Sequence, residues 1–413
     1  MKEKVNRIVS NLRIVLVIYI LFAVIASFQS YFSSKTTFDD GLEYNKYNNY
    51  VIFEKSAEHL RHGQDLYKLY PQEHWDLFKY TPSFSAFFTI FNLLPDWLGL
   101  CLWNLLNALI LYLAIYYLPK LSNLKKGLLL FIVLLELLTS MQSEQSNGLI
   151  AGLLVLTFGL LERDKVFWAS LCIVFSVFIK LFGIVGFVLF LFYPNKWKSI
   201  VYTVFWSAIL LVIPLFFVDY NQYIKLFSSY LNLLKDDHNA SYGFSVMGWI
   251  HTWFSVDFNK NIVVFIGIVV FLLPLVKFKL YKDETFRILM LCSVLLWIVI
   301  FNHKAESPTF IIAMAGVAIW YIISEKNKIN NSLFILSMLL TSFSPTDLFP
   351  RQLRESLIIP YALKAFPCIL IWIKISYELI KKRENNLETI DPLAPHNIPS
   401  LLDLPSNYGD KLT

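Results

Sequence analysis

The hydrophobic residues of this chain occur in long unbroken runs, separated by shorter polar stretches. Residues 11–28 (NLRIVLVIYILFAVIASF), 127–138 (GLLLFIVLLELL) and 261–276 (NIVVFIGIVVFLLPLV) are typical of these runs. They come close to the ~20 residues that a helix needs to cross a bilayer. About twelve such spans can be placed along the chain, so the pattern predicts an all-α polytopic membrane protein.

The longest polar interruption is the stretch 35–82, which follows the first span. Loops of this length are usually functional or disordered, and the many aromatic residues here argue against disorder. Within it, NYVIFEKSAEHLRHG has apolar positions at helical spacing and ends at Gly63, which predicts a surface helix. The apolar segment 83–95 is too short to span, so we expect an interfacial or re-entrant helix.

The composition agrees with this organisation. Of the 413 residues, 56% are hydrophobic and 16% are charged, whereas about 25% are charged in a typical soluble domain. We therefore predict one membrane domain over 1–380, with an outer loop over 33–82, and a disordered cytoplasmic tail over 381–413, which is polar and rich in proline. The four cysteines lie in apolar runs, where we expect them to be core residues.

The charges of the loops predict the orientation. One set of loops, which includes KEKVNR, KLSNLKK and KFKLYKDETFR, is rich in Lys and Arg and alternates with a second set that includes 35–82. Because cytoplasmic loops carry the excess of positive charge, we expect both termini in the cytoplasm of the cell and the second set outside. The alternation also favours a turn at Lys180–Gly183 over one long kinked helix.

Candidate ligands for an anion lie in the outer set of loops. Lys180 ends a span, and His303, Lys304 and Glu306 form the tightest polar cluster, in NHKAESPTF. Lysine and histidine together suit a phosphate or pyrophosphate group. Lys180 could instead snorkel to the membrane interface, and the cluster could serve only to begin the next helix.

Two further outer segments offer polar groups. Arg351 and Arg354 are three residues apart, so both guanidinium groups would lie on one face of a helix and could bind phosphate oxygens bidentately. A solvated helix start is the alternative. Gln145 and Asn147 could hydrogen-bond sugar hydroxyls, although capping of a helix by Asn147 is the simpler interpretation.

The stretch 35–82 supplies the carboxylates from which a general base could come. Activating a sugar hydroxyl needs one positioned Asp or Glu, and Asp40, Glu43 and Asp76 are the catalytic candidates. Asp65, in HGQDLY, could instead accept backbone hydrogen bonds after Gly63. The histidines of this stretch lack the i, i+4 spacing of a helical zinc pair, so we expect no metal.

Several short motifs follow one another in a definite order. They are F-x-x-S-A-x-x-L-x-x-G-x-D-L-Y from Phe53 to Tyr67, Y-x-P from Tyr80, W-N-x-x-N from Trp103, Gln145-Ser146-Asn147, and Lys180. This order resembles that of glycosyltransferase family 87, in the GT-C superfamily, which includes PimE-like mannosyltransferases. The resemblance extends over about residues 10–380.

The resemblance implies a GT-C-like helical bundle that transfers a sugar, often mannose, from a polyprenyl-phosphate donor to a lipid or glycan acceptor. The transfer would invert the anomeric centre and take place on the outer face of the cell membrane. The resemblance implies no cofactor. The partners that it implies are a lipid-linked sugar donor, a lipid or glycan acceptor and membrane lipids, and they include no nucleic acid. It adds Asn49, Asp65, Tyr67 and Tyr80 to the expected substrate site.

The base is where this chain departs from the family pattern. The usual acid of the family precedes the F-x-x-S-A helix by a few residues, and here that place holds Asn48 and Asn49. Asparagine cannot act as a base. Either Asp40 or Glu43 takes the role, or the chain is a divergent member with altered activity.

Two other functions fit the same features. A transporter or flippase of lipid-linked sugars would use the same cations, but it needs polar groups near the midplane, where this chain has few. A scaffold for envelope assembly, descended from an enzyme that lost its base, would need none of the carboxylates.

Overall fold

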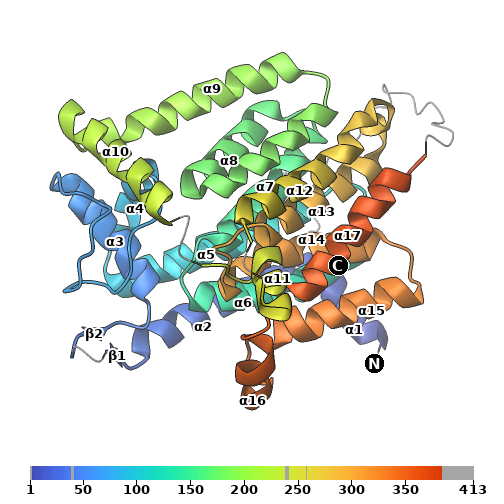
Figure 1. Cartoon of the computed structure of the whole chain (residues 1–413), viewed down its shortest axis with the longest axis horizontal. Helices are drawn as coiled ribbons and strands as arrows, with labels where there is room; N and C mark the ends of the chain where they lie inside the picture. Colours follow the sequence, from blue (N-terminus) through green and yellow to red (C-terminus); the bar gives the residue numbers. More distant parts are fainter. Residues whose placement is uncertain (1, 39–40, 238–240, 257, 384–413) are drawn as a thin grey trace, which may run out of the picture. The chain divides into compact units, whose positions relative to one another are not determined.

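The computed structural model describes residues 2–38, 41–237, 241–256 and 258–383, and most of these are helical (Figure 1). The elements of the first half are α1 (Lys2–Ser10), α2 (Leu12–Phe32), β1 (Thr36–Thr37), β2 (Glu43–Tyr44), α3 (Asn48–Arg61), α4 (Pro82–Asn92), α5 (Asp96–Tyr116), α6 (Asn123–Gln142), α7 (Asn147–Leu161), α8 (Val166–Ile179) and the 3-10 helix η1 (Leu181–Phe192).

The second half is helical as well. Its elements are α9 (Lys196–Val212), η2 (Ile213–Phe216), α10 (Tyr220–Asp237), α11 (Val246–Phe254), α12 (Lys260–Leu272), η3 (Leu273–Val276), η4 (Phe278–Lys282), α13 (Glu284–Ile300), η5 (Ser307–Thr309), α14 (Phe310–Ile323), α15 (Lys328–Ser337), the π-helix η6 (Met338–Phe343), α16 (Arg351–Leu353), the π-helix η7 (Arg354–Ile358) and α17 (Phe366–Lys381). The strands β1 and β2 pair antiparallel, with Thr36 opposite Tyr44.

The central helices pack closely because small residues face their neighbours. Every residue of α7 is buried, and this helix packs against α5 and α8. A Cβ atom on Gly152 of α7 would lie only 2.8 Å from the backbone carbon of Ile110 in α5. A glycine therefore permits this approach of two backbones, as is usual where membrane helices touch.

Several helices are apolar enough to cross a membrane. Among the described residues, α2, α5 and the continuous helix Lys196–Phe216 combine sufficient length and hydropathy, and five shorter apolar helices accompany them. Only 17% of the most apolar window of Lys196–Phe216 is buried by protein, so most of its surface is left for lipid. The prediction of an all-α membrane protein is confirmed, whereas the number of about twelve spans stays a prediction.

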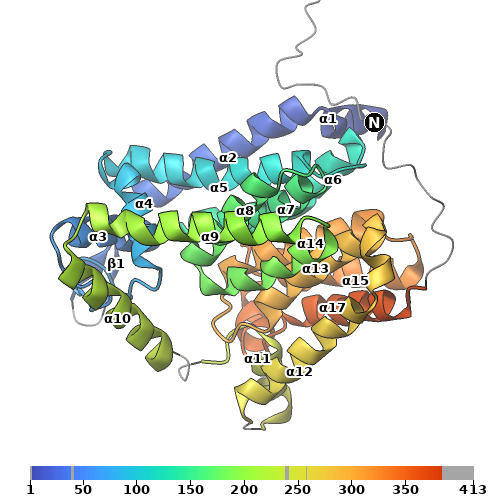
Figure 2. The ribbon, with the colours of Figure 1, turned by 90° about the horizontal axis from the view of Figure 1, so that it is seen from above.

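The two predicted sets of loops lie at different ends of the bundle. Ion pairs join segments expected in the cytoplasm: Lys120 contacts Glu284, Arg287 Nε lies 2.6 Å from Glu162 Oε1, and Lys382 Nζ lies 3.2 Å from Asp283 Oδ2. Figures 1 and 2 both show α3, α4 and α10 together at the end away from the N-terminus.

The turn predicted at Lys180 is confirmed. Helix α8 ends at Ile179, Lys180 has extended backbone angles, and η1 begins at Leu181. The new helix folds back along α8. The two approach so closely that a Cβ atom on Gly183 would meet the backbone of Ser176 at 2.9 Å. The chain therefore turns sharply at one lysine.

The predicted helix in the stretch 35–82 exists, but its expected position on the surface is wrong. Helix α3 buries nine of its fourteen residues. Its Phe53 ring contacts the rings of Tyr80, Phe84 and Trp103, with centroids 4.8–5.9 Å apart. The aromatic residues Tyr50 and Phe53, three residues apart on α3, help to explain the burial, because each finds an aromatic partner on α4 or α5. The short helix α4 lies where 83–95 was predicted, and the tail 384–413 lies outside the described residues.

Candidate active site

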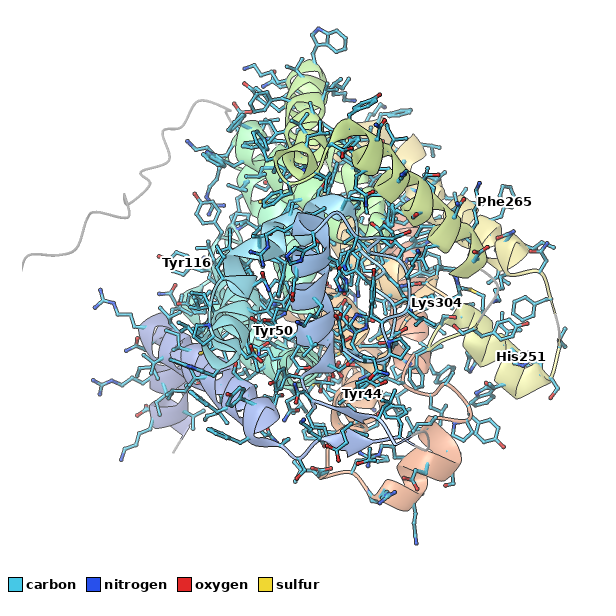
Figure 3. The ribbon with its side chains drawn as sticks, turned by 90° about the vertical axis from the view of Figure 1, so that its left-hand side faces the viewer. Tyr44, Tyr50, Tyr116, His251, Phe265 and Lys304 are labelled. Carbon is cyan, nitrogen blue, oxygen red and sulfur yellow. The ribbon has the colours of Figure 1, made fainter. Side chains whose placement is uncertain are left out.

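A cavity of about 320 Å³ lies at the end of the bundle that carries α3, α4 and α10. Segments that are far apart in the sequence meet there, and Figure 3 views this end of the molecule. The lining residues are Asn49, Ile52, Phe53, Asp76, Leu77, Lys79, Tyr80, Gln145, Lys180, Leu181, Phe182, Tyr230, Leu234, Asn302, His303, Lys304, Glu306 and Thr309. Four predicted outer loops and the turn at Lys180 thus contribute to one cavity.

Lys180 provides the buried positive charge of this cavity. Its Nζ donates hydrogen bonds to Gln145 Oε1 at 3.2 Å and Asn147 Oδ1 at 3.1 Å. Burial lowers the pKa of Lys180 to about 8, against an opposing contribution from nearby Glu306. Both hydrogen-bond acceptors are neutral amides, so they orient the ammonium group without cancelling its charge. A lysine held in this way is suited to an anionic ligand.

Tyr80 connects the aromatic core to the polar lining. Its hydroxyl donates to Gln145 Oε1 at 3.3 Å and accepts a hydrogen bond from Ser146 Oγ at 3.4 Å. Its ring stacks on Phe84 with centroids 4.7 Å apart, and Lys180 Nζ lies 5.4 Å from its centroid. Burial raises the pKa of Tyr80, so its phenol stays protonated at neutral pH.

The G-x-D-L-Y motif supports the cavity from behind. Asp65 Oδ1 accepts the backbone N–H of Tyr67 at 3.0 Å, and its Oδ2 accepts Ser229 Oγ of α10 at 3.0 Å. The Tyr67 hydroxyl donates to the Tyr80 carbonyl at 2.9 Å. Asp65 and Tyr67 do not line the cavity. Their hydrogen bonds are structural, which for Asp65 was the alternative interpretation of the sequence.

Among the described residues, two carboxylates line the cavity, Asp76 and Glu306. Asp76 forms an ion pair with Lys79, with Nζ and Oδ1 3.0 Å apart, and it is partly exposed. Glu306 begins η5, where its side chain and Thr309 form a reciprocal capping box. Both carboxylates are close enough to Tyr80 to contribute to its raised pKa. Either acid is therefore available to a ligand in this cavity.

Asn49 occupies the part of the wall where the family pattern places an acid. It is the second residue of α3 and its Nδ2 donates to the Ser143 carbonyl at 2.8 Å. An amide anchors this corner of the cavity, and an amide cannot act as a base. Of the other catalytic candidates, Glu43 is exposed in β2 and does not line the cavity, and Asp40 lies outside the described residues.

The segment 302–309 lines the opposite side of the cavity. Lys304 N donates to Asn302 Oδ1 at 2.9 Å, and the His303 carbonyl accepts Ser241 Oγ at 3.0 Å. These bonds hold a short irregular loop whose His303 and Lys304 side chains line the same cavity as Lys180. These residues therefore meet in one cavity as their positions in the sequence predicted. Lys79, Asn302 and Thr309 also line it and were not predicted, because they carry no distinguishing local signal.

The expectation that Arg351 and Arg354 join this cavity is wrong. Arg351 is exposed and its Nε pairs with Glu355 Oε1 at 2.6 Å. Arg354 donates from Nη1 to the carbonyls of Pro345 and Thr346 and lines a second cavity. The backbone between the two is α-helical, since Arg354 N donates to the Pro350 carbonyl at 3.1 Å. The pair separates because each side chain finds a different partner: Arg351 turns to Glu355, and Arg354 turns to the Pro345 and Thr346 carbonyls.

Metal binding gains no support from the histidines of the outer loop. His59 Nε2 lies 3.0 Å from Glu73 Oε2, and its ring packs on Tyr70. Within the described parts of the chain, no three His, Cys, Asp or Glu side chains are grouped to hold a metal ion. The expectation of no metal stays a prediction.

Comparison with known proteins identifies the relatives of this chain. The sequence profile of glycosyltransferase family 87 matches residues 78–345, well over half of the chain. The matched region includes Tyr80, Gln145, Lys180 and the segment 302–309 of the cavity. A search of curated proteins found no significant match.

Proposed function

Because the chain belongs to glycosyltransferase family 87, we propose that it transfers a hexose from a polyprenyl-phosphate donor to a lipid or glycan acceptor. Mannose is the first sugar to test. The observation that carries the proposal is Lys180, a partly buried ammonium group held by neutral amides in a cavity that also contains carboxylates. A sugar phosphate needs both an anion-binding group and a base for the attacking hydroxyl.

Lys180 is suited to stabilise the leaving phosphate. As the bond between the anomeric carbon and the phosphate oxygen breaks, negative charge builds up on that oxygen. A preorganised cation in a site with little water stabilises such charge more than it does in bulk water. His303 and Lys304 line the same cavity and add donors for the phosphate oxygens.

Asp76 is the proposed base. It would take the proton of the acceptor hydroxyl as that oxygen forms a bond to the anomeric carbon, while the phosphate leaves from the opposite side. One displacement of this kind inverts the anomeric centre. Asp76 pairs directly with Lys79 at 3.0 Å, and Glu306 is the other acid of the cavity.

The charge of the loops supports an outward-facing cavity. Ion pairs join Lys120 to Glu284 and Arg287 to Glu162. The loops that contain these residues carry the excess of Lys and Arg, and such loops usually stay in the cytoplasm. The cavity is built instead from the other set of loops. A lipid-linked donor fits an outer site, because nucleotide sugars are made in the cytoplasm.

A transfer assay tests the proposal. Full-length protein in lipid vesicles would receive polyprenyl-phosphate mannose or glucose, labelled in the sugar, together with a lipid extract as acceptor. We expect a labelled product, and we expect Asp76→Asn to lower turnover by about 100-fold or more, since a general base contributes that much. Glu58→Gln is the matched control, because Glu58 pairs with Lys55 on α3 and lines no part of the cavity.

A second function is favoured by Asn49, the amide at the place of the expected acid. An envelope-assembly scaffold or a flippase of lipid-linked sugars would bind the donor in this cavity without transferring the sugar. Donor binding without product, together with normal cellular function of Asp76→Asn and Glu306→Gln variants, would favour that function over transfer.

A further inference from the structure

A second cavity, of about 680 Å³, lies beside the first and is not used by the proposed transfer. Its polar lining comes from α6, from the start of η5, and from the irregular region between η6 and α17. The lining residues are Leu135, Leu138, Thr139, Gln142, Ser143, Phe244, Ser307, Pro308, Ser344, Pro345, Thr346, Asp347, Leu348, Arg354, Ile358, Ile359 and Lys364. None of them lines the first cavity.

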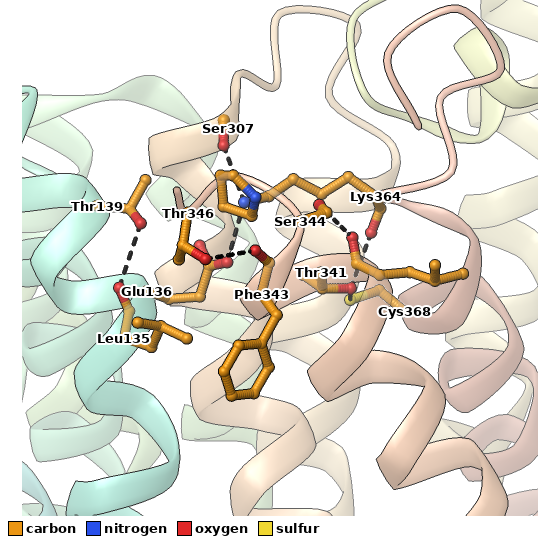
Figure 4. A network of polar contacts seen from close by, with 12 residues as sticks. Leu135, Glu136, Thr139, Ser307, Thr341, Phe343, Ser344, Thr346, Lys364 and Cys368 are labelled. Atoms are coloured by element: carbon orange, nitrogen blue, oxygen red, sulfur yellow. Dashed lines mark hydrogen bonds and ion pairs between the residues drawn. The ribbon is translucent and has the colours of Figure 1, made fainter. Parts of the chain in front are cut away.

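The deepest charged group of this cavity is Lys364, which is only 2% exposed. Its Nζ donates to Glu136 Oε1 and to Ser307 Oγ, both at 2.9 Å (Figure 4). An ammonium group has three donors, so these two contacts leave one for a ligand. Glu136 does not line the cavity, and its Oε2 has no hydrogen-bond partner in the described structure.

Arg354 adds a second cation to the same wall. Only its Nη1 is used, by the carbonyls of Pro345 and Thr346 at 3.2 and 3.4 Å. Within the part of the chain that the structure describes, its Nε and Nη2 make no hydrogen bond. These atoms form the fork that binds two oxygens of one phosphate.

The rim of the cavity is apolar and exposed. Leu348 is 82% exposed and Ile359 is 52% exposed, although both line the cavity. Exposed apolar side chains at a membrane interface pack against lipid chains, so this rim suits a lipid chain and the cations suit its headgroup. Asp347 is the one carboxylate of the lining, and it lies exposed beside Leu348, toward the rim.

The backbone around this cavity departs from α-helical geometry at several places. Both π-helices of the described chain, η6 and η7, adjoin it, and Ala362 has a positive φ of 48°. Stretches of π-helix occur often at functional sites. Here they place Arg354 and Lys364, which are ten residues apart, in the wall of one cavity.

We propose that this second cavity binds the phosphate group of an anionic membrane lipid. Arg354 and Lys364 bind the phosphate oxygens, the hydroxyl and amide groups of Thr139, Gln142 and Thr346 surround the headgroup, and the hydrocarbon chain follows Leu348 and Ile359 into the bilayer. This binding does not depend on sugar transfer in the first cavity.

Native mass spectrometry of the full-length protein in detergent tests the proposal. The probe is phosphatidylglycerol, and the comparators are a phosphate-free galactosyl diacylglycerol and inorganic phosphate. We expect phosphatidylglycerol to bind at least about 10-fold more tightly than either comparator. Equal binding of inorganic phosphate would overturn the role of the lipid chain, and equal binding of the galactolipid would overturn the role of the phosphate.

Substitutions locate the site. Arg354→Gln is expected to weaken lipid binding about 10-fold, whereas Arg351→Gln, three residues earlier and paired with Glu355, should leave it unchanged. Equal effects of the two substitutions would overturn the assignment. Lys180→Met should leave lipid binding intact, which separates this site from the first cavity.

Loss of Lys364 requires a variant that folds. Replacing both members of a buried ion pair is tolerated far better than replacing one, so Lys364→Met is combined with Glu136→Gln. The double variant should keep its melting temperature within a few degrees and lose lipid binding about 10-fold. Unchanged lipid binding in a folded double variant would show that Lys364 is structural only.

Discussion

Two lysines lie in two neighbouring cavities, Lys180 partly buried and Lys364 fully buried, and their partners differ. Lys180 is held by the neutral amides of Gln145 and Asn147, whereas Lys364 is held by the carboxylate of Glu136 and the hydroxyl of Ser307. Neutral acceptors leave the charge of Lys180 available to an anionic substrate. The ion pair of Lys364 is nearly neutral as a unit, so that lysine serves packing first and needs Arg354 beside it to attract an anion.

The largest expected difference between the two lysines is in stability. Lys364→Met should lower the free energy of unfolding by about 3–5 kcal/mol, because it leaves Glu136 buried with no cation. Lys180→Met should cost only about 1–2 kcal/mol, because it leaves uncharged amides. Thermal unfolding in detergent compares them, with Lys55→Met on α3 as the control. Equal losses for both lysines would show that their partners do not decide the cost.

For turnover we expect the reverse order of the two lysines, with the larger loss in the Lys180 variant. Lys180→Met is expected to lower sugar transfer by about 10- to 100-fold through loss of charge stabilisation on the leaving phosphate. Lys180→Arg should recover part of the activity, since it restores the charge with a different shape. The transfer assay in vesicles measures both. Full activity of Lys180→Met would remove this lysine from the reaction.

The pH dependence of the reaction sharpens the role of Lys180. Burial lowers its pKa to about 8, so the cationic form dominates below that pH and falls tenfold for each further pH unit above it. We expect kcat/KM to fall above pH 8, because this ratio reports groups of the enzyme without substrate. In Lys180→Arg the fall should disappear. A decline that persists in that variant would belong to another group.

The smallest expected effect concerns Glu54, a partly buried carboxylate on α3. Burial, with help from nearby Asp96, raises the pKa of Glu54 to about 7. The folded protein thus binds this proton more tightly than the unfolded chain, and stability contributed below about pH 4.5 is lost as the pH rises through 7. Glu54→Gln should add about 1 kcal/mol of stability at pH 8 and little at pH 5, after allowance for partial exposure.

Thermal unfolding at the two pH values measures this effect. Glu58→Gln on the same helix is the control, because Glu58 is paired with Lys55 at 2.7 Å and its pKa is lowered. A gain from Glu54→Gln that is the same at both pH values would point to packing and away from ionisation.

The sequence predicted Lys180 because a charge in an apolar run is conspicuous, and it predicted the helices because their periodicity is strong. It could not predict Lys364, which looks like any residue near the start of a helix until Glu136, 228 residues earlier, is seen beside it. The burial of α3 was missed for a similar reason, since the partners of Phe53 lie on α4 and α5. Local patterns fix elements, whereas long-range pairs fix what those elements bury.

The two arginines show a different limit. Their i, i+3 spacing is α-helical as expected, but Arg351 pairs with Glu355 whereas Arg354 bonds to the carbonyls of Pro345 and Thr346. The prediction of the catalytic base from the sequence had a similar limit. By type Asp40, Glu43 and Asp76 all qualified, and the family pattern favoured Asp40 or Glu43, whereas the folded chain places Asp76 in the lining of the cavity.

The wall between the two cavities has a thermodynamic consequence. Glu306 lines one cavity and Ser307, the next residue, lines the other, and on the opposite side Asn49 of the first cavity bonds to Ser143 of the second. A ligand that shifts this wall from one side changes the free energy of binding on the other. Linkage then requires the effect to be mutual, so a lipid that tightens donor binding by some factor must itself be bound more tightly, by that same factor, when the donor is present.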